Sequence, residues 1–249
     1  MRRFFILTKA LLLMHMRNRT TLFWNLAFPV FLLVIYSQIF GAMDVGGINF
    51  MAWVVPGVVV FNILAFGLLS SGTLMVNMRE KGVLRRLQAS PIPAGQLVGS
   101  YLLVNVLIAL LQSTIILVFA ALVFRTPLTL GGALRALPMI VFGILAFVAL
   151  GQVISGVAAT AGVAVAIGQI LNFSQMFITD MIMPMDMMPE WIQKVAPYLP
   201  AYATVQLVRP PLVEGSFSPD LWSNLLLMVA YTAVAGLVAA RLFRWAPQA

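Results

Sequence analysis

Six apolar runs of about 20 residues constrain this chain more than any other feature of its sequence. A hydrocarbon core about 30 Å thick is crossed by about 20 residues of helix, so each run can span a bilayer. The runs cover residues 21–40, 51–76, 97–124, 136–157, 163–183 and 221–243. Unpaired backbone groups are costly in lipid, and the short alternating segments of a membrane barrel are missing. The sequence therefore predicts an all-α integral membrane protein with about six transmembrane helices.

The basic residues lie unevenly on the two sides of these predicted spans. With the N-terminus inside, 11 of the 15 basic residues fall in cytoplasmic segments, and only Arg125, Arg135, Lys194 and Arg209 lie outside. Cytoplasmic loops are normally enriched in Lys and Arg, so both termini are predicted to be cytoplasmic. The five tryptophans fall near predicted span ends, as expected for aromatic belts. They are Trp24, Trp53, Trp191, Trp222 and Trp245.

The composition excludes several kinds of chemistry. The chain has no Cys and a single His, His15, so neither a thiolate nor a multi-histidine metal site is expected. It has no G-x-x-x-x-G-K-[ST] motif for nucleotide phosphates. The net charge of +8 comes from residues at span ends, which indicates topology rather than a nucleic-acid partner. We expect no catalytic, cofactor-binding or metal-binding residue in this chain.

Charged residues avoid the middle of every predicted span, which argues against a proton-coupled carrier. Asp180, Asp186 and Glu190 gather on the predicted outer side and could bind a cation or act as an acid–base pair. Their spacing fits no metal loop, and avoidance of basic residues outside explains them better.

Three segments are neither spans nor short turns. In residues 2–18, Phe4, Leu7, Leu11 and Met14 form an apolar stripe at helical spacing, which predicts a helix in the cytoplasmic interface. The alternative is that this segment is only the basic cytoplasmic flank of the first span, and happens to be helical. Residues 79–93 predict a short docking helix, with an ordinary connecting loop as the alternative. Residues 184–219 are rich in proline, and predict short helices against or partly in the outer leaflet, with an extracellular loop as the alternative.

Two of these segments carry sequence motifs. The run M-R-E-K-G-V-L-R-R-L-Q-A-S-P at residues 78–91 resembles the coupling segment of ABC-2 type exporter permeases, R-E-x-G-x-[LIV]-x-x-L-x-x-[ST]-P. The run M-P-E-W-I-Q-K-V-A-P-Y-L-P-A-Y at residues 188–202 resembles the [LM]-P-x-W-[LI]…[LN]-P-x-x-Y segment that follows the fifth span of that family. One departure is that the family's Leu-Asn-Pro reads Leu199-Pro200 here, so the turn that Asn provides must be made differently.

The resemblance implies one ABC-2 type transmembrane domain over residues 1–249. Residues 1–20 would be its interface helix, residues 78–93 its coupling helix, and residues 184–219 its re-entrant outer helices. The coupling helix would seat on an ATPase subunit through Arg79, Glu80, Val83, Leu84 and Leu87.

Polar uncharged residues occur within the predicted spans. On the fifth span Gln169, Asn172 and Met176 share one face, and an amide is unfavourable toward lipid. Hydrogen bonding between helices is one reading; the resemblance implies the other, a substrate pathway lined by the second and fifth spans. The residues predicted to contact substrate are Phe61, Asn62, Phe66, Gln169, Asn172, Phe173 and Met176.

The function implied is ATP-driven export of an amphipathic, drug-like or lipid-like substrate across the plasma or inner membrane. A second permease copy, as a homodimer, and two copies of an ATPase subunit would be the partners, with ATP and Mg²⁺ bound by the ATPase. A structural or assembly protein without transport activity is the alternative. An intramembrane enzyme is disfavoured, because no paired nucleophile and base lie at membrane depth.

Overall fold

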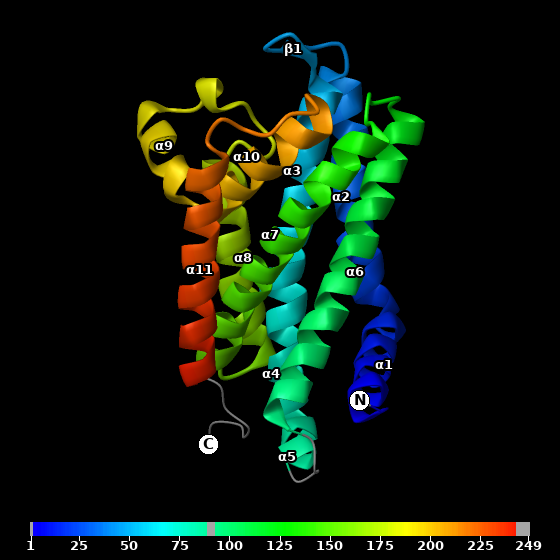
Figure 1. Cartoon of the computed structure of the whole chain (residues 1–249), viewed down its shortest axis with the longest axis vertical. Coiled ribbons are helices and arrows are strands. Elements are labelled where there is room, and N and C mark those ends of the chain that lie inside the picture. Colours follow the sequence, from blue (N-terminus) through cyan, green and yellow to red (C-terminus); the bar gives the residue numbers. More distant parts are fainter. Residues whose placement is uncertain (1, 89–92, 243–249) are drawn as a thin grey trace.

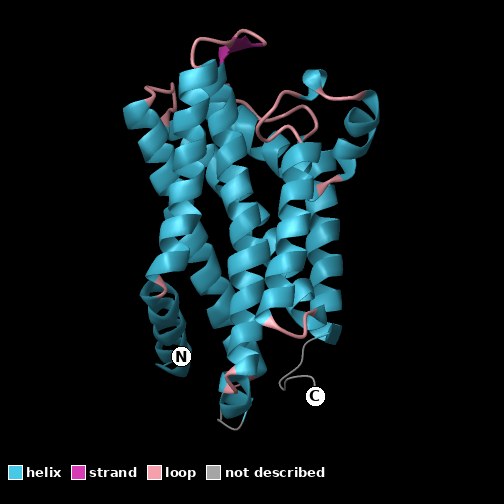
Figure 2. Ribbon diagram, turned by 180° about the vertical axis from the view of Figure 1, so that it is seen from behind, coloured by secondary structure: helices cyan, strands magenta, loops and turns pink. Residues whose placement is uncertain are grey.

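The computed structural model describes residues 2–88 and 93–242, which form a bundle of long helices (Figures 1 and 2). Six helical runs within the described residues are long and apolar enough to cross a membrane, which confirms the predicted all-α membrane fold. They are α2 (Arg19–Phe40), a continuous run from α3 to α4, α6 (Ala94–Val123), α7 (Leu130–Val157), α8 (Ala161–Ile178) and α11 (Leu221–Leu242).

The two ends of the bundle differ in what they carry. Helix α1 (Arg2–Arg17) begins and α11 ends at the same end, as an even number of spans requires; we call it the terminal end (Figure 1). The opposite end carries a short antiparallel hairpin of β1 (Asp44–Val45) and β2 (Ile48–Asn49), and we call it the hairpin end. The orientation of these ends across the membrane stays a prediction.

One helical run forms the centre of the bundle. It consists of α3 (Phe50–Ala65), a π-helical segment η1 (Phe66–Ser71) and α4 (Gly72–Glu80). Its most apolar 18 residues are 89% buried, against 11% for α2 and α11. Helix α7 packs directly on its π-helical part, because a Cβ at Gly151 would lie 2.0 Å from the Gly67 carbonyl oxygen. Small residues of this kind let membrane helices pack backbone to backbone.

Helix α1 is amphipathic, as predicted, but its buried stripe differs by one residue. Leu7 and Leu11 are buried, and the third position is His15, whereas Met14 is exposed. Helix α1 packs beside α6 at the terminal end, and Phe4 lies against Gly99 of that helix. Its position in a membrane interface stays a prediction.

The proline-rich segment folds into short helices at the hairpin end. They are the 3₁₀ turn η2 (Met185–Met187), α9 (Glu190–Val195), the 3₁₀ turn η3 (Ala196–Tyr198) and α10 (Pro200–Val213). Helix α9 is exposed, but α10 is buried among α3, α7 and α11 (Figure 1). The family's Asn is absent before Pro200, the first residue of α10. Gln175 of α8 caps this helix instead, because its Oε1 accepts a hydrogen bond from the Ala201 N–H at 3.0 Å.

Some boundaries differ from the predicted ones. Helix α8 ends at Ile178 rather than at residue 183, because Thr179 turns the backbone to an extended conformation and its hydroxyl bonds back to the Gln175 carbonyl. Helix α7 begins at Leu130 rather than at residue 136, because Thr129 caps it by accepting a hydrogen bond from Gly132 N–H. Residues 89–92 of the coupling segment, and Phe243, Arg244 and Trp245, lie outside the described residues.

Candidate functional site: a groove between α2 and α8

A groove lies between α2 and α8, with the central run from α3 to α4 as its floor. It consists of two adjoining cavities of about 340 Å³ and 230 Å³. Both are lined by Trp24 and Asn25 of α2, Leu69 of η1 and Gln169 of α8, so the two form one continuous space. It runs from the junction of α1 and α2 toward the middle of the bundle.

The cavity nearer the hairpin end is mostly apolar, with four aromatic rings and four amide side chains among its eleven lining residues. It contains five of the seven residues predicted to contact substrate, namely Phe61, Asn62, Gln169, Asn172 and Phe173. The wall provided by α2 was missed by the sequence analysis: Trp24 and Phe28 line it, and the Phe28 ring lies 5.6 Å from that of Phe61. The sequence analysis did single out Trp24, but only as an aromatic residue near a membrane interface.

Two predicted contact residues do not line the groove. Phe66 is fully buried at the start of η1, and its ring lies 5.5 Å from the His15 ring of α1. Met176 is 7% exposed and belongs to the hydrophobic core. Neither residue lines either of the two cavities in this structure.

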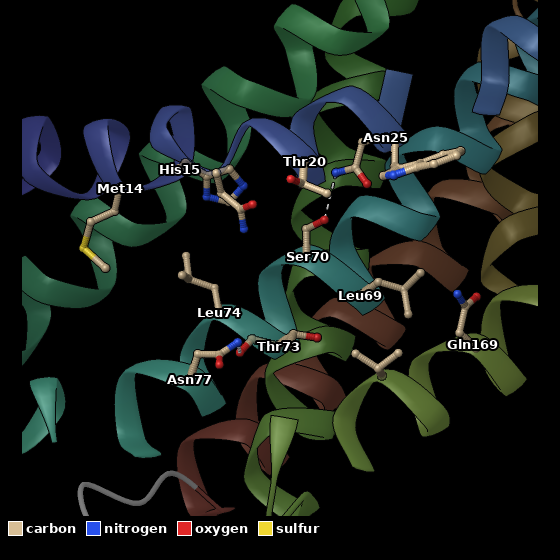
Figure 3. Close-up of a pocket in the computed structure, with 13 residues that line it drawn as sticks. Met14, His15, Thr20, Asn25, Leu69, Ser70, Thr73, Leu74, Asn77 and Gln169 are labelled. Atoms are coloured by element: carbon tan, nitrogen blue, oxygen red, sulfur yellow. Dashed lines mark hydrogen bonds between the residues drawn. The ribbon is translucent and has the colours of Figure 1, made fainter. Parts of the chain in front are cut away.

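The cavity nearer the terminal end has eight polar residues among the thirteen that line it (Figure 3). Helices α1 and α2 place His15, Thr20 and Asn25 on one side, while the central run places Ser70, Thr73 and Asn77 opposite them. Asn25 donates a hydrogen bond to the Ser70 hydroxyl at 2.8 Å, which ties α2 to the floor. Burial lowers the pKa of His15, so its imidazole is favoured in the neutral form.

Several polar atoms of the groove residues have no hydrogen-bond partner within the described part of the chain. They include Oδ1 of Asn62, Oδ1 of Asn172 and Nδ1 of His15, and all three residues are at most 5% exposed. Asn62 uses its Nδ2 to bond the Asn25 carbonyl at 2.7 Å, so its carbonyl oxygen is the unused group. A buried polar atom left unpaired costs about 1–3 kcal/mol, so the groove has hydrogen-bonding capacity that the fold does not use.

The predicted coupling residues lie at the terminal end, where α4 meets the short helix α5 (Val83–Gln88) (Figure 1). Leu84 is fully buried, and Val83 and Leu87 are half-buried against the core. Arg79 is 3% exposed and donates to backbone carbonyls at the end of α7. Glu80 accepts a hydrogen bond from the first residue of α8. Among the α5 side chains from residue 83 to residue 87, Arg85 and Arg86 are exposed.

Two of the carboxylates that were expected to gather on the outer side, Asp180 and Glu190, form ion pairs with different partners. Asp180 is buried and forms an ion pair with Arg209 of α10 at 2.5 Å, while Arg209 also stacks 4.1 Å over the Trp53 ring. Glu190 instead pairs with Lys194 on the exposed helix α9. Within residues 2–88 and 93–242, no group of three or more potential metal ligands of the His, Cys, Asp or Glu type comes together.

The fold and the groove together define a class, a multi-pass membrane protein with a groove of mixed polar and apolar lining that has more aromatic rings toward the hairpin end. The comparison with known families is more specific. The profile described as "ABC-2 type transporter" matches residues 2–212, and the chain belongs to this family. It is a membrane subunit of a transporter, as the resemblance of residues 78–91 and 188–202 predicted.

Two curated relatives agree with this assignment. The chain is 24% identical over 220 residues to "Putative transport permease YvfS" of Bacillus subtilis (strain 168), covering 87% of this chain and 86% of that protein. It is 23% identical over 198 residues to "Probable multidrug ABC transporter permease YbhR" of Escherichia coli (strain K12). That match covers 79% of this chain and 53% of the E. coli protein, so this chain spans about half of its length.

Proposed function

We propose that two copies of this chain and two copies of a separate ATPase subunit form an exporter for amphipathic, drug-like or lipid-like substrates. The observation that carries the proposal is the groove between α2 and α8, which offers hydrogen-bonding groups at its terminal end and aromatic rings further along. An amphipathic molecule has the same two parts. ATP and Mg²⁺ would be bound by the ATPase subunit.

The lining of the groove favours a substrate that is not an anion. Within the described residues, no Lys, Arg, Asp or Glu side chain lines either cavity, and burial favours neutral His15. A buried charge needs an opposite charge nearby, and none is offered here. The multidrug designation of the E. coli relative belongs to that protein, and it agrees with an apolar, aromatic pathway.

The ATPase subunit would dock at the terminal end, on α5. Arg85 and Arg86 are exposed there, with Val83 and Leu87 half-buried beside them, which suits a partner with an acidic rim and an apolar centre. Leu87→Asp would put a charge into that contact and should uncouple ATP hydrolysis from transport. Wild-type assembly and transport by this variant would contradict the docking proposal.

The second copy of the permease would face α8 and α2. Ile170 and Phe177 on α8 are 67% and 61% exposed, and Phe31 on α2 is 59% exposed, so these helices offer apolar surface to a neighbour. The chain has no native Cys, so Phe177→Cys can be tested for a crosslinked dimer with thiol reagents of graded length. Leu226→Cys on α11, which is 71% exposed, is the matched lipid-facing control.

The decisive test is reconstitution of this chain with a P-loop ATPase subunit that co-purifies with it, followed by a screen for compounds that stimulate ATP hydrolysis. Stimulation by neutral amphiphiles, with transport into inverted vesicles, is expected. If no P-loop ATPase co-purifies, the alternative of a structural or assembly protein is favoured. In intact cells, Cys at Ser216 should be labelled from outside and Cys at Ala89 should not be.

A further inference from the structure

The last turn of α4 contacts both sides of the turn that joins α7 to α8. Arg79 Nη1 donates to the Ser155 carbonyl at 2.9 Å, and Nη2 donates to the Ala158 carbonyl. Ser155 lies in the last turn of α7 and Ala158 directly follows it. The carbonyls at a helix C-terminus have no partner within the helix and carry partial negative charge, so a guanidinium is well suited to bind them.

The next residue contacts the other side of the same turn. Glu80 Oε1 accepts a hydrogen bond of 3.0 Å from the N–H of Ala161, the first residue of α8. Thr160 caps the same helix from within the turn, by accepting a hydrogen bond from the Val163 N–H. A carboxylate at a helix N-terminus is stabilised by the helix dipole. Arg79 and Glu80, which we call the 79–80 clasp, therefore bind the end of α7 and the start of α8 at once.

The clasp is also joined closely to α5. Only Lys81 and Gly82 separate α4 from α5, and Gly82 has a φ of 66°, a conformation that other residues rarely adopt. Arg86 of α5 donates back to the Lys81 carbonyl at 3.2 Å, and Leu84 is fully buried. Helix α5, this tight turn and the clasp are thus held together by backbone connection, a hydrogen bond and packing.

Helix α8 carries the other end of this connection. Gln169 and Asn172, which line the groove, lie eight and eleven residues after Ala161 on the same helix, about 12 Å and 17 Å along its axis. An α-helix moves largely as a rigid unit, so a displacement at its first residue changes the position of the groove wall.

We propose that Arg79 and Glu80 are positioning residues that transmit displacement of α5 to α8 and so to the groove. This inference rests on the proposed function, in which an ATPase subunit docks on α5. According to this inference, Arg79 and Glu80 do not bind the ATPase but act on the turn between α7 and α8 of their own chain. The sequence motif had placed both residues in the docking contact.

The test uses the transporter reconstituted with its ATPase. The Glu80→Ala variant should still assemble with the ATPase. Its stimulation of ATP hydrolysis by substrate, measured relative to its own basal rate, should fall at least about fivefold, because fivefold is the lower end of the usual coupling between two sites. Glu80→Gln keeps an oxygen acceptor for the Ala161 N–H and should recover most of the stimulation. Thr160→Val is the control, because it removes a cap from the same helix end without affecting the link to α4.

Thr160→Val should lower the thermal midpoint but keep substrate stimulation. If the 79–80 clasp were purely structural, Glu80→Ala would do the same: it would lower the midpoint and keep substrate stimulation. Equal coupling in Glu80→Ala and wild type overturns the inference. Failure of the wild-type chain to bind any ATPase would instead overturn the proposed function, so the two failures are distinguishable.

A second measurement serves if Glu80→Ala does not reach the membrane. Cys at residues 80 and 161, joined by a short bifunctional reagent, restore the link covalently in a chain without native Cys. The crosslinked transporter should show substrate stimulation, and the same double variant without reagent should not. If the crosslinked transporter shows no more stimulation than the double variant without reagent, a link between α4 and α8 does not carry the coupling, which also overturns the inference.

Discussion

The bundle contains two sets of buried polar side chains that differ in how far the fold satisfies them. Between α6, α7 and the central run, Ser71, Tyr101 and Gln152 bond one another: Gln152 Nε2 donates to the Ser71 hydroxyl at 3.0 Å and to the Tyr101 hydroxyl at 3.1 Å. Tyr101 also bonds the Ser71 carbonyl at 2.6 Å. In the groove, by contrast, Asn62 and Asn172 keep carbonyl oxygens without a partner within the described residues.

The difference separates two roles that polar residues have in a membrane helix. Polar side chains that bond one another across helices stabilise the fold, on average by about 0.6 kcal/mol each. Unpaired buried groups add no such stabilisation, and those on residues that line a cavity are available to a ligand. We infer that the satisfied set serves the fold and that the groove amides serve a ligand, and the predictions below test this division.

The largest effect is expected at the buried ion pair. Asp180→Ala leaves the Arg209 guanidinium buried without its carboxylate, which costs about 3–5 kcal/mol, or roughly 10 °C of thermal midpoint in detergent. Asp186→Ala, which removes an exposed carboxylate from the same segment, should leave the midpoint unchanged.

The double variant Asp180→Leu/Arg209→Leu removes both charges and should recover part of the loss, because no unpaired charge remains. If the losses of the single changes Asp180→Leu and Arg209→Leu simply add in the double variant, the two residues have no mutual dependence. The ion pair would then not explain how α10 is held against α3.

The ion pair also shows where sequence reasoning stops. The six spans were predictable because each depends on local hydrophobicity, and the Gln169 and Asn172 face because it depends on helical period. Asp180 and Arg209 are 29 residues apart, and nothing local in either segment indicates that they pair. Their pairing depends on how α10 packs against the rest of the bundle.

Three side chains have positions that the sequence analysis did not give, each for a physical reason. Phe66 follows Asn62 by one α-helical turn, but it opens the π-helical segment and points to His15 of α1, so a regular period does not apply there. His15 appeared isolated in sequence, and it lines the cavity nearer the terminal end because the last turn of α1 lies next to the central run, where its ring is 5.5 Å from that of Phe66. Arg79 lies in a motif that predicted docking, and only the packing of α4 against α7 shows that it is buried.

A smaller effect is expected for the satisfied set. Gln152→Met keeps the side-chain volume but removes the amide that bonds Ser71 and Tyr101, which should cost about 1 kcal/mol and lower the midpoint by about 2–4 °C. Tyr36→Phe is the control, because the Tyr36 hydroxyl has no hydrogen bond within the described part of the chain. Substrate stimulation of ATP hydrolysis should be unchanged in both variants.

The smallest effect on stability is expected in the groove itself. Asn172→Leu removes an amide whose Oδ1 bonds nothing in the described residues, so the midpoint should stay within about 2 °C of the wild type. If a substrate donor uses that oxygen, losing one hydrogen bond should weaken stimulation by about threefold to tenfold. The variant would then change function without changing the fold, the reverse of Gln152→Met.

Gln112 of α6 makes this test specific. It is 2% exposed, both of its amide atoms lack partners within the described residues, and it does not line the groove. Gln112→Leu should therefore leave substrate stimulation unaltered and should not lower the midpoint, because it removes only unpaired polar atoms. If Gln112→Leu changes stimulation as much as Asn172→Leu, unpaired amides matter wherever they lie, and position in the groove explains nothing. If Asn172→Leu lowers the midpoint as Gln152→Met does and leaves stimulation intact, the groove amides are packing contacts, and the division between the two sets disappears.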